Sequence, residues 1–370
     1  MDEIRNLLAA LVRGEGMLAN WPATNDPLPL YQAALHHGLI PLVADRIGAE
    51  GGVPLAFGER IREESRRHAA ADMLREAELR LLLGAMASAR VEVLVVKGVH
   101  LAYSAYARPD LRPRVDTDLL VRPQACATAS AVLLELGYGA PRHTSGHFVS
   151  YQAQNVKRRD GMVLHAVDLH WRIANPQVFA AVLSFEELRS ASVPLARLHP
   201  TARAPSSVHA LLLACVHRVA HHFDSDRLIW LYDIHLLASA ATRSEWQEFS
   251  TLAVDRGVAA VCCRSLERAA ECFRTHLPGD VMDTLRIGAA TRADEPTVAY
   301  LLRDRRPVTG FLADARALPG WSARWQLTRE HLFPPRQYMR DVYAPASCVP
   351  LPALYTWRII RGALKWLKRA

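Results

Sequence analysis

The chain has 370 residues, enough to form one large hydrophobic core or two or three smaller ones. Half of the residues are hydrophobic and 22% are charged, and this balance excludes an intrinsically disordered protein. The net charge of +8 suits a partner that carries phosphates, and nucleotides, RNA and anionic lipid all meet that description.

Residues 1–90 are expected to be helical. Near the N-terminus, apolar residues recur at helix spacing, at Leu7, Leu8, Leu11 and Val12. Segment 20–29 contains three prolines with neighbouring polar residues, which predicts a loop. Segment 61–90 is rich in Ala, Glu, Arg and Leu and predicts one long amphipathic helix.

Residues 91–175 are expected to hold the sheet. The predicted order is strand, helix, strand, helix and two strands, over 91–96, 99–106, 116–121, 123–136, 148–156 and 162–171. The last two strands should form a hairpin that turns at 158–161, because Asp-Gly favours a tight turn. The result would be a small mixed sheet.

Three aspartates in this region are candidate metal ligands. Asp116 and Asp118 are two apart on a strand, so their side chains share a face, with Cα atoms roughly 6–7 Å apart. Mg²⁺ prefers oxygen ligands, and one or two carboxylates plus substrate phosphates suffice. Asp168 lies in the apolar centre of another strand, where a cation or an arginine would offset the cost of its charge. The alternative for Asp116 and Asp118 is a turn or an exposed rim.

Residues 176–300 return to helices, over 209–222, 230–241, 245–257 and 258–273, with Ser206 as a cap. His217 and His221 are four apart and share a helix face, and His222 follows them. They could bind a metal, line a nucleotide or acceptor pocket, or be rim histidines satisfied by Asp224, Asp226 or Asp233. The Glu of a zinc-protease His-Glu-x-x-His motif is missing.

The tail 354–370 predicts a basic amphipathic helix. Trp357, Ile360, Leu364 and Leu367 form its apolar face, opposite Arg358, Arg361, Lys365 and Lys368. We expect this helix to dock on the protein with its basic side in solvent. The alternatives are peripheral contact with an anionic membrane or with RNA.

The six cysteines form no Cys-x-x-Cys pair, which argues against a disulfide framework and a zinc site. The N-terminal residues do not have the pattern of a signal peptide, and no apolar run is long enough to form a transmembrane segment. These features predict a cytoplasmic protein.

The chain resembles the DNA polymerase β-like nucleotidyltransferase superfamily. More closely, it resembles a bacterial family of uncharacterised nucleotidyltransferases with a Lys-Gly, Arg-Pro, Asp-x-Asp-Leu-Leu-Val pattern. The matching residues are Lys97-Gly98, Tyr106, Arg112-Pro113, Asp116 with Asp118 and the three residues after it, Asp168 to Trp171, His217, His221, Asp233, 332–335, Tyr338 and Met339.

The resemblance implies an α+β fold, with a small mixed nucleotidyltransferase-type sheet flanked by helices. Four regions would follow one another: an N-terminal helical region (1–90), a catalytic core (91–175), a helical domain forming the other wall of a nucleotide cleft (176–300), and a C-terminal extension (301–370).

The resemblance also implies roles for site residues. Asp116, Asp118 and Asp168 would hold the metals and carry catalysis. Superfamily members usually have Gly-Ser after the first strand, to hold triphosphate, and here the dipeptide is Lys97-Gly98. The glycine would let the backbone approach a phosphate at a helix start, and the lysine would add a point charge. Arg112 would contact nucleotide phosphates bidentately, unless it belongs to a solvated loop.

These features predict an enzyme that moves an NMP from an NTP such as ATP to an acceptor, with Mg²⁺ or Mn²⁺ as cofactor and release of pyrophosphate. The acceptor could be a small molecule, a peptide or protein, or RNA. One alternative is a kinase that transfers the γ-phosphate, although kinase and Walker glycine loops are absent. Another is a non-catalytic protein that binds nucleotide or RNA, against which the three carboxylates argue.

Overall fold

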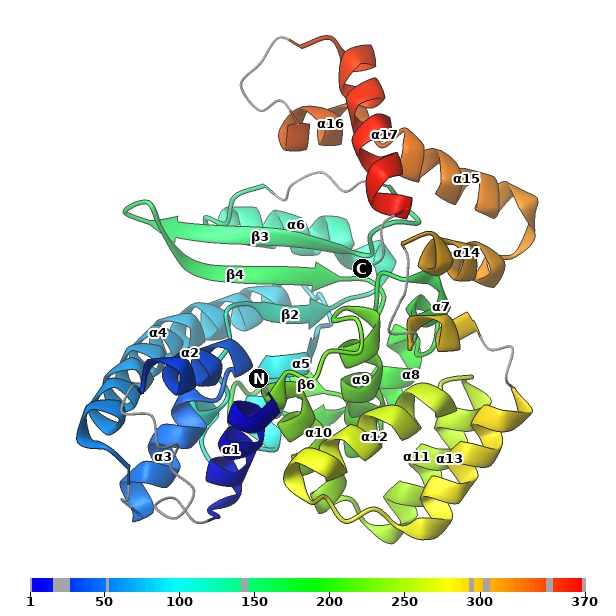
Figure 1. Cartoon of the computed structure of the whole chain (residues 1–370). Coiled ribbons are helices and arrows are strands. Elements are labelled where there is room, and N and C mark those ends of the chain that lie inside the picture. The colour runs from blue at the N-terminus through cyan, green and yellow to red at the C-terminus, as the bar shows by residue number, and fades with distance from the viewer. Residues whose placement is uncertain are drawn as a thin grey trace.

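The computed structural model describes residues 2–15, 27–50, 53–140, 146–292, 296–301, 307–343 and 349–367. Helices surround one mixed sheet, so the predicted α+β fold is confirmed. In Figure 1 the N-terminal helices and the α9–α13 region lie below the long strands, and α15–α17 lie above them. None of the helices in the described ranges is both long and apolar enough to cross a membrane.

The N-terminal region is helical, as predicted. Its helices are α1 (Asp2–Arg13), α2 (Leu28–His37), α3 (Ile40–Glu50) and α4 (Leu55–Ser88). Helix α2 begins inside the segment predicted as a loop, because proline fits the first turn of a helix, where its missing N–H is not needed. Residues 20–26 of that predicted loop lie outside the described residues. Helix α4 extends the predicted long helix towards the N-terminus, as far as the residue after Pro54.

The sheet has the order β3-β4-β2-β1-β6-β5. Its strands are β1 (Leu94–Val96), β2 (Thr117–Leu120), β3 (Gln152–Arg159), β4 (Met162–His170), β5 (Val193–Pro194) and β6 (Arg203–Ala204). Strand β2 pairs with β4 in parallel and with β1 antiparallel. The predicted strand-helix order is confirmed, and helices α5 (Lys97–Ser104) and α6 (Cys126–Glu135) fill the two helix positions. The two-residue strands β5 and β6 were not predicted.

The β3-β4 hairpin turns where the sequence predicted. Asp160 and Gly161 both have positive φ, 51° and 79°, as a two-residue type I′ turn requires. Several predicted boundaries were wrong, including that of β3, which begins at Gln152 and not at residue 148. Strand β1 begins only at Leu94, and Lys97 belongs to helix α5 instead of lying between strand and helix.

The helical region contains α7 (Gln177–Ala180), α8 (Phe185–Ser190), α9 (Ser207–Ala220), α10 (Leu228–Ala240), α11 (Arg243–Asp255), α12 (Ala259–Phe273) and α13 (Gly279–Thr291). Ser206 caps α9 by accepting a hydrogen bond from the backbone N–H of His209, as expected from its position. Thr242 and Glu245 form a reciprocal capping box at the start of α11.

Two cores lie on the two faces of the sheet. Because side chains alternate along a strand, Leu119 and Leu169 face the core under α4 and α6, whereas Leu120 faces the larger core. That larger core also contains side chains of α1–α3 and α9–α13. By the same alternation, Asp118 and Asp168 point away from α4, towards the helical region.

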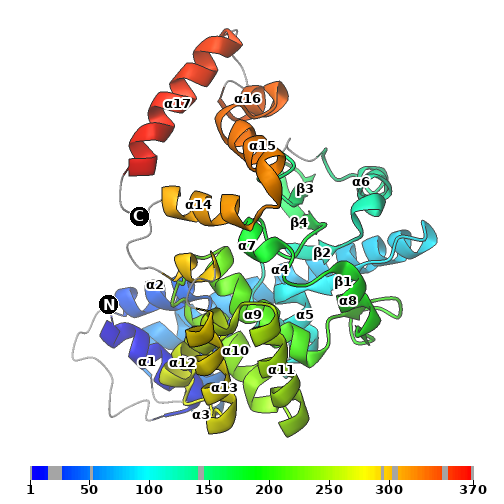
Figure 2. The same ribbon diagram turned by 90° about the vertical axis from the view of Figure 1, so that its right-hand side faces the viewer.

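The C-terminal region consists of α14 (Pro307–Ala317), α15 (Gly320–Leu332), α16 (Arg336–Tyr343) and α17 (Leu351–Leu367). Figure 2 shows α15–α17 standing apart from the helical region. The predicted tail helix is confirmed, but the expected packing of its faces is wrong at Trp357, Arg358 and Ile360. Arg358 donates to the Tyr343 hydroxyl and the His331 carbonyl, whereas Trp357 and Ile360 are exposed. Lys368 lies outside the described residues.

Candidate active site

Asp118 and Asp168 face the same cleft from adjacent strands. They are register partners on the parallel strands β2 and β4, and Asp118 also pairs with Val96 at the end of β1. Both side chains are buried. Parallel pairing of β2 with β4 therefore brings together two carboxylates that are far apart in the sequence.

Asp116 lies beside this pair. Burial, followed by the charges of Asp118 and Asp168, raises the pKa of Asp116 to about 6. Like charges raise the pKa of a carboxyl group in this way only when they are close together. The structure thus groups the three predicted aspartates, and their mutual repulsion makes the position favourable for a cation.

Lys97 places an ammonium group on this carboxylate cluster. Its Nζ donates to Asp118 Oδ1 at 2.7 Å and lies 3.3 Å from His170 Nε2. Burial alone would raise the pKa of Asp118, but the Lys97 charge and the hydrogen bond from His170 outweigh burial and hold this pKa well below its usual range. Lys97 has φ of 55°, a left-handed conformation that is uncommon for a residue with a Cβ.

His170 belongs to the carboxylate cluster and lies on the same face of β4 as Asp168. Its Nε2 is 2.8 Å from Asp118 Oδ1, and the ring is buried. Because Asp168 and His170 are two apart on β4, strand alternation alone places them on the same face. That rule could have identified His170 from the sequence.

Two glutamines on β3 orient the third carboxylate. Gln152 and Gln154 each donate a side-chain N–H to Asp168, at 3.1 Å in both cases. Gln154 is the register partner of Asp168, and Gln152 is that of His170. The sequence interpretation missed both glutamines, although their spacing on the predicted hairpin would have placed them on this face.

The donor set fits a divalent cation. Asp118, Asp168 and His170 each offer a ligand atom, and these atoms lie within 4.8 Å of one another. Carboxylate oxygens suit Mg²⁺ and Mn²⁺, and imidazole suits first-row transition metals. Asp116 adds a further carboxylate next to them.

Arg112 is engaged by a carboxylate. Its Nε and Nη2 donate to Asp233 of α10 at 2.7–3.1 Å, and its Nη1 donates to the Pro113 carbonyl. The Tyr106 hydroxyl donates to the same aspartate at 2.7 Å. Asp233 therefore pairs with the edge of the Arg112 guanidinium that we expected to bind a nucleotide phosphate bidentately. Nearby, a Cβ built on Gly98 would lie 3.7 Å from the Arg112 guanidinium.

The opposite wall of the cleft is formed by His217 of α9 and by His221 and His222, which follow the end of this helix. Nε2 of His217 is 3.1 Å from Nε2 of His222, and the His222 ring stacks on Trp230 at 3.6 Å. Burial, with Lys97 as the next cause, lowers the pKa of His221 to about 3 and that of His222 to about 4. These rings are therefore neutral near pH 7.

The expected carboxylate partners of these histidines were wrong. Asp224 pairs with Arg218 and Arg264, Asp226 pairs with Arg5 and Arg268, and Asp233 pairs with Arg112. Among the described residues, His217 Nδ1 and His221 Nε2 are buried and have no hydrogen-bond partner. The three histidines are also not part of the one metal-ligand group found in the described ranges.

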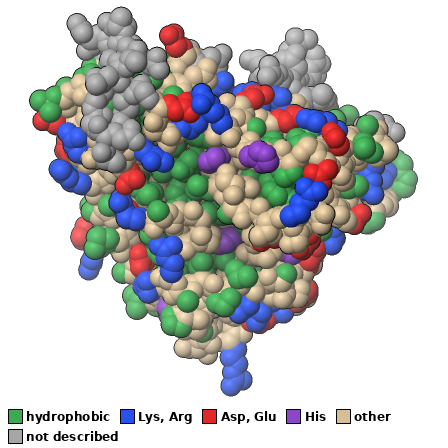
Figure 3. Space-filling view, turned by 90° about the horizontal axis from the view of Figure 1, so that it is seen from below, with side chains coloured by type: hydrophobic (Ala, Val, Ile, Leu, Met, Phe, Trp, Pro, Cys, Tyr) green, Lys and Arg blue, Asp and Glu red, His purple; other side chains and the backbone are tan. Residues whose placement is uncertain are grey.

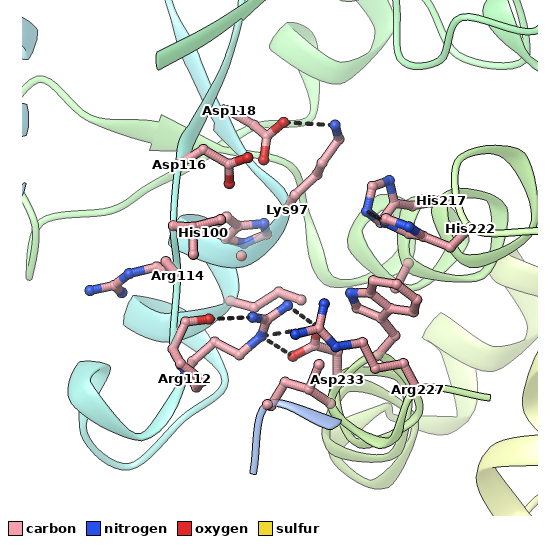
Figure 4. A pocket seen from close by; sticks show the side chains of 18 of the residues that line it. Lys97, His100, Arg112, Arg114, Asp116, Asp118, His217, His222, Arg227 and Asp233 are labelled. Carbon is pink, nitrogen blue, oxygen red and sulfur yellow. Dashed lines mark hydrogen bonds and ion pairs between the residues drawn. The ribbon is translucent and has the colours of Figure 1, made fainter. Parts of the chain in front are cut away.

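These residues line a cleft of about 480 Å³, a size typical of small-molecule sites. In Figure 4, Asp116, Asp118 and Lys97 lie at one end, His217 and His222 at the side, and Arg227 and Asp233 at the other end. Elements of the N-terminal region, the sheet and the helical region all contribute lining residues. The cleft can hold a metal, a phosphate chain and a second molecule next to them.

Comparison with known proteins identifies the family. The family described as "Uncharacterised nucleotidyltransferase" matches residues 23–274, about two thirds of the chain. The match includes every residue of the carboxylate cluster and both walls of the cleft. The search of curated proteins gave no match. The chain belongs to this nucleotidyltransferase family.

Proposed function

We propose that this nucleotidyltransferase moves a nucleoside monophosphate from an NTP to a hydroxyl group of an acceptor and releases pyrophosphate. The observation that carries this proposal is the in-register pairing of Asp118 with Asp168, with Asp116 and Lys97 beside them in a cleft of nucleotide size. The acceptor would be a small molecule, a peptide or protein, or RNA.

Asp116, Asp118 and Asp168 would hold Mg²⁺ or Mn²⁺, with His170 as a further ligand or as a partner that fixes Asp118. Such a cation, once bound, neutralises phosphate charge and aligns the attacking and leaving oxygens of an in-line displacement. Gln152 and Gln154 keep the Asp168 carboxylate in position through their hydrogen bonds.

The residues of the chain would then perform the transfer. The acceptor oxygen attacks the α-phosphorus, the bond from that phosphorus to the bridging oxygen of the β-phosphate breaks, and Asp168 accepts the hydroxyl proton. Gly98 lies in the first turn of α5, and its backbone would face a phosphate group there, because the N-terminus of a helix favours an anion. Lys97 would add positive charge as pyrophosphate forms, and Arg112, held by Asp233, would fix the loop before β2.

The proposal is tested by label transfer. The protein is incubated with Mn²⁺ or Mg²⁺, a cell extract and each NTP, labelled at either the α- or the γ-phosphate. We expect label to enter an acceptor from the α position only. Asp116→Asn and Asp118→Asn should abolish this transfer, because each removes one negative charge from the cation site.

The matched control is Asp160→Asn. It changes the same group in an exposed hairpin turn, at a left-handed position that asparagine tolerates well. This variant should keep full activity. Label from the γ position would instead establish a kinase, and full transfer by both Asp116→Asn and Asp118→Asn would overturn the site assignment.

A further inference from the structure

Arg227 lines the cleft and forms no ion pair with any carboxylate of the described residues. The other lysine and arginines that line the cleft are paired: Lys97 with Asp118, Arg112 with Asp233, and Arg114 with Asp72. Within the described part of the chain, no carboxylate or carbonyl accepts a hydrogen bond from the Arg227 side chain, and its Nε is buried without a partner.

The surroundings of Arg227 hold the guanidinium in place without neutralising it. The group lies over the Trp230 ring, 5.1 Å from the ring centroid. On another side, the guanidinium lies beside Gly38 at the end of α2, since a Cβ built on this glycine would be 3.5 Å from Nη2, an ordinary contact distance. Burial and the nearby Arg112 lower the pKa of Arg227, which is the direction expected for a cation that lacks a counter-ion.

Uncompensated positive charge in a partly buried site is costly, and a bound anion offsets that cost. Arginine suits this purpose because its planar fork matches the oxygens of phosphate and carboxylate. The neighbouring His217 Nδ1 and His221 Nε2 are unpartnered as well, so the wall offers further hydrogen bonds to a ligand.

We infer that Arg227 is an anion-binding residue of the cleft, which holds a phosphate or carboxylate group at the end away from Asp118. Figure 4 shows this separation between Arg227 and Asp118. Two sources share the required chemistry: the β- and γ-phosphates of the NTP, and an anionic group on the acceptor. The inference rests on the proposed function for placing these molecules in the cleft.

The test measures binding and needs no turnover. In the first arm, inorganic tripolyphosphate is titrated into the full-length protein in EDTA, with heat release as the readout. In the second arm, inorganic phosphate is titrated into protein saturated with Mn²⁺ and α,β-methylene ATP. Each arm compares wild type with Arg227→Gln and with Arg159→Gln, which removes the same charge from the exposed end of β3.

We expect wild type and Arg159→Gln to bind alike. Arg227→Gln should lose about tenfold or more in affinity in one arm, because hydrogen bonds to a charged group are lost. A loss of affinity for tripolyphosphate would show that Arg227 binds the β- and γ-phosphates of the NTP. A loss confined to the second arm would show that Arg227 binds an anionic group of the acceptor. Arg227→Lys, which keeps the charge but not the fork, should bind with intermediate affinity and serves as a folding check.

Equal affinities of wild type and Arg227→Gln in both arms would overturn the inference, as would a wild type that binds neither probe. These outcomes are distinct from failure of the proposed function, which would appear as no α-label transfer. Anion binding in EDTA can persist in a protein that transfers nothing.

Discussion

The ammonium group of Lys97 pairs with Asp118, the carboxylate that a bound metal ion would need. Its ammonium group is 2.7 Å from Asp118 Oδ1, and its backbone is held in a left-handed conformation at the start of α5. Strained residues of this kind are found preferentially at active sites, where the surrounding structure fixes them. Lys97 and a metal would therefore compete for Asp118.

Replacing Lys97 with glutamine should raise the affinity for Mn²⁺ by about tenfold, because a competing charge is removed from Asp118. The same change should lower nucleotidyl transfer, because phosphates lose a positive partner. Calorimetry and label transfer measure the two effects. Lys157→Gln removes a lysine that pairs with Glu78 outside the cleft and is the control. Weaker Mn²⁺ binding by Lys97→Gln would contradict the competition.

His165 makes stability depend on pH. The ring is fully buried between the Thr117 hydroxyl and the Tyr138 hydroxyl. Burial lowers its pKa from 6.5 to about 4. The unfolded chain therefore binds a proton at a higher pH than the native state, so the stabilisation is complete above pH 6.5 and is lost as the pH falls towards 4.

Acidification across this window should lower the free energy of unfolding by roughly 3 kcal/mol through His165 alone. Urea denaturation at pH 7.5 and pH 4.5 measures the loss. His165→Gln should show a smaller loss than wild type, whereas replacement of the exposed His276 by glutamine should leave it unchanged. An equal loss in His165→Gln and wild type would exclude this residue as a cause.

At the scale of elements, Arg112 and Asp233 fasten the segment before β2 to α10. Both side chains are buried, and Tyr106 donates to the same carboxylate. Breaking one half of a buried ion pair leaves an uncompensated charge. This contact thus helps to keep the two walls of the cleft together.

Asp233→Asn should lower the free energy of unfolding by about 3 kcal/mol. The exposed pair Arg243–Asp280 provides the control, since Asp280→Asn should cost less than about 1 kcal/mol. Urea denaturation compares the two variants. Similar losses in both would show that burial does not govern the contribution of the Arg112 pair.

Local patterns in the sequence predicted much of this site. Strand alternation and the Asp-Gly turn were sufficient for the strand-helix order, the hairpin and the shared face of Asp116 and Asp118, and the family resemblance added Asp168 to them. Contacts over long sequence separations carry no such signal: Arg112 and Asp233 are 121 residues apart, and no spacing rule links them. Strands β5 and β6 have only two residues each, too few to show alternation.

At the scale of the whole molecule, charges of both signs are mixed on the face that Figure 3 shows. In the view of Figure 3, basic and acidic side chains are interspersed, with hydrophobic ones between them. The net charge of +8 is therefore not gathered into one basic patch on this face. A phosphate-bearing substrate would therefore be recognised by the cations of the cleft and not by a basic patch on this face.

The four regions predicted from the sequence should differ in how independently they fold. Side chains of α1–α3 share the larger core with α9–α13, whereas Met339 and Leu354 of α16 and α17 form a small separate cluster. Limited proteolysis followed by mass spectrometry should therefore separate α15–α17 from the rest before any cut separates α1–α4. Early release of an intact N-terminal fragment would contradict this order.

The pairing of β2 with β4 also has a consequence for the order of folding. A parallel pair cannot be closed by a tight turn, and here α6 and β3 lie between the two strands. Such non-local pairings form late, after much loop-closure entropy has been lost. A cation that needs both Asp118 and Asp168 would therefore find no site in early folding intermediates. The bound cation would slow unfolding while leaving the refolding rate nearly unchanged. It would therefore increase the kinetic stability of a chain that must first fold without it.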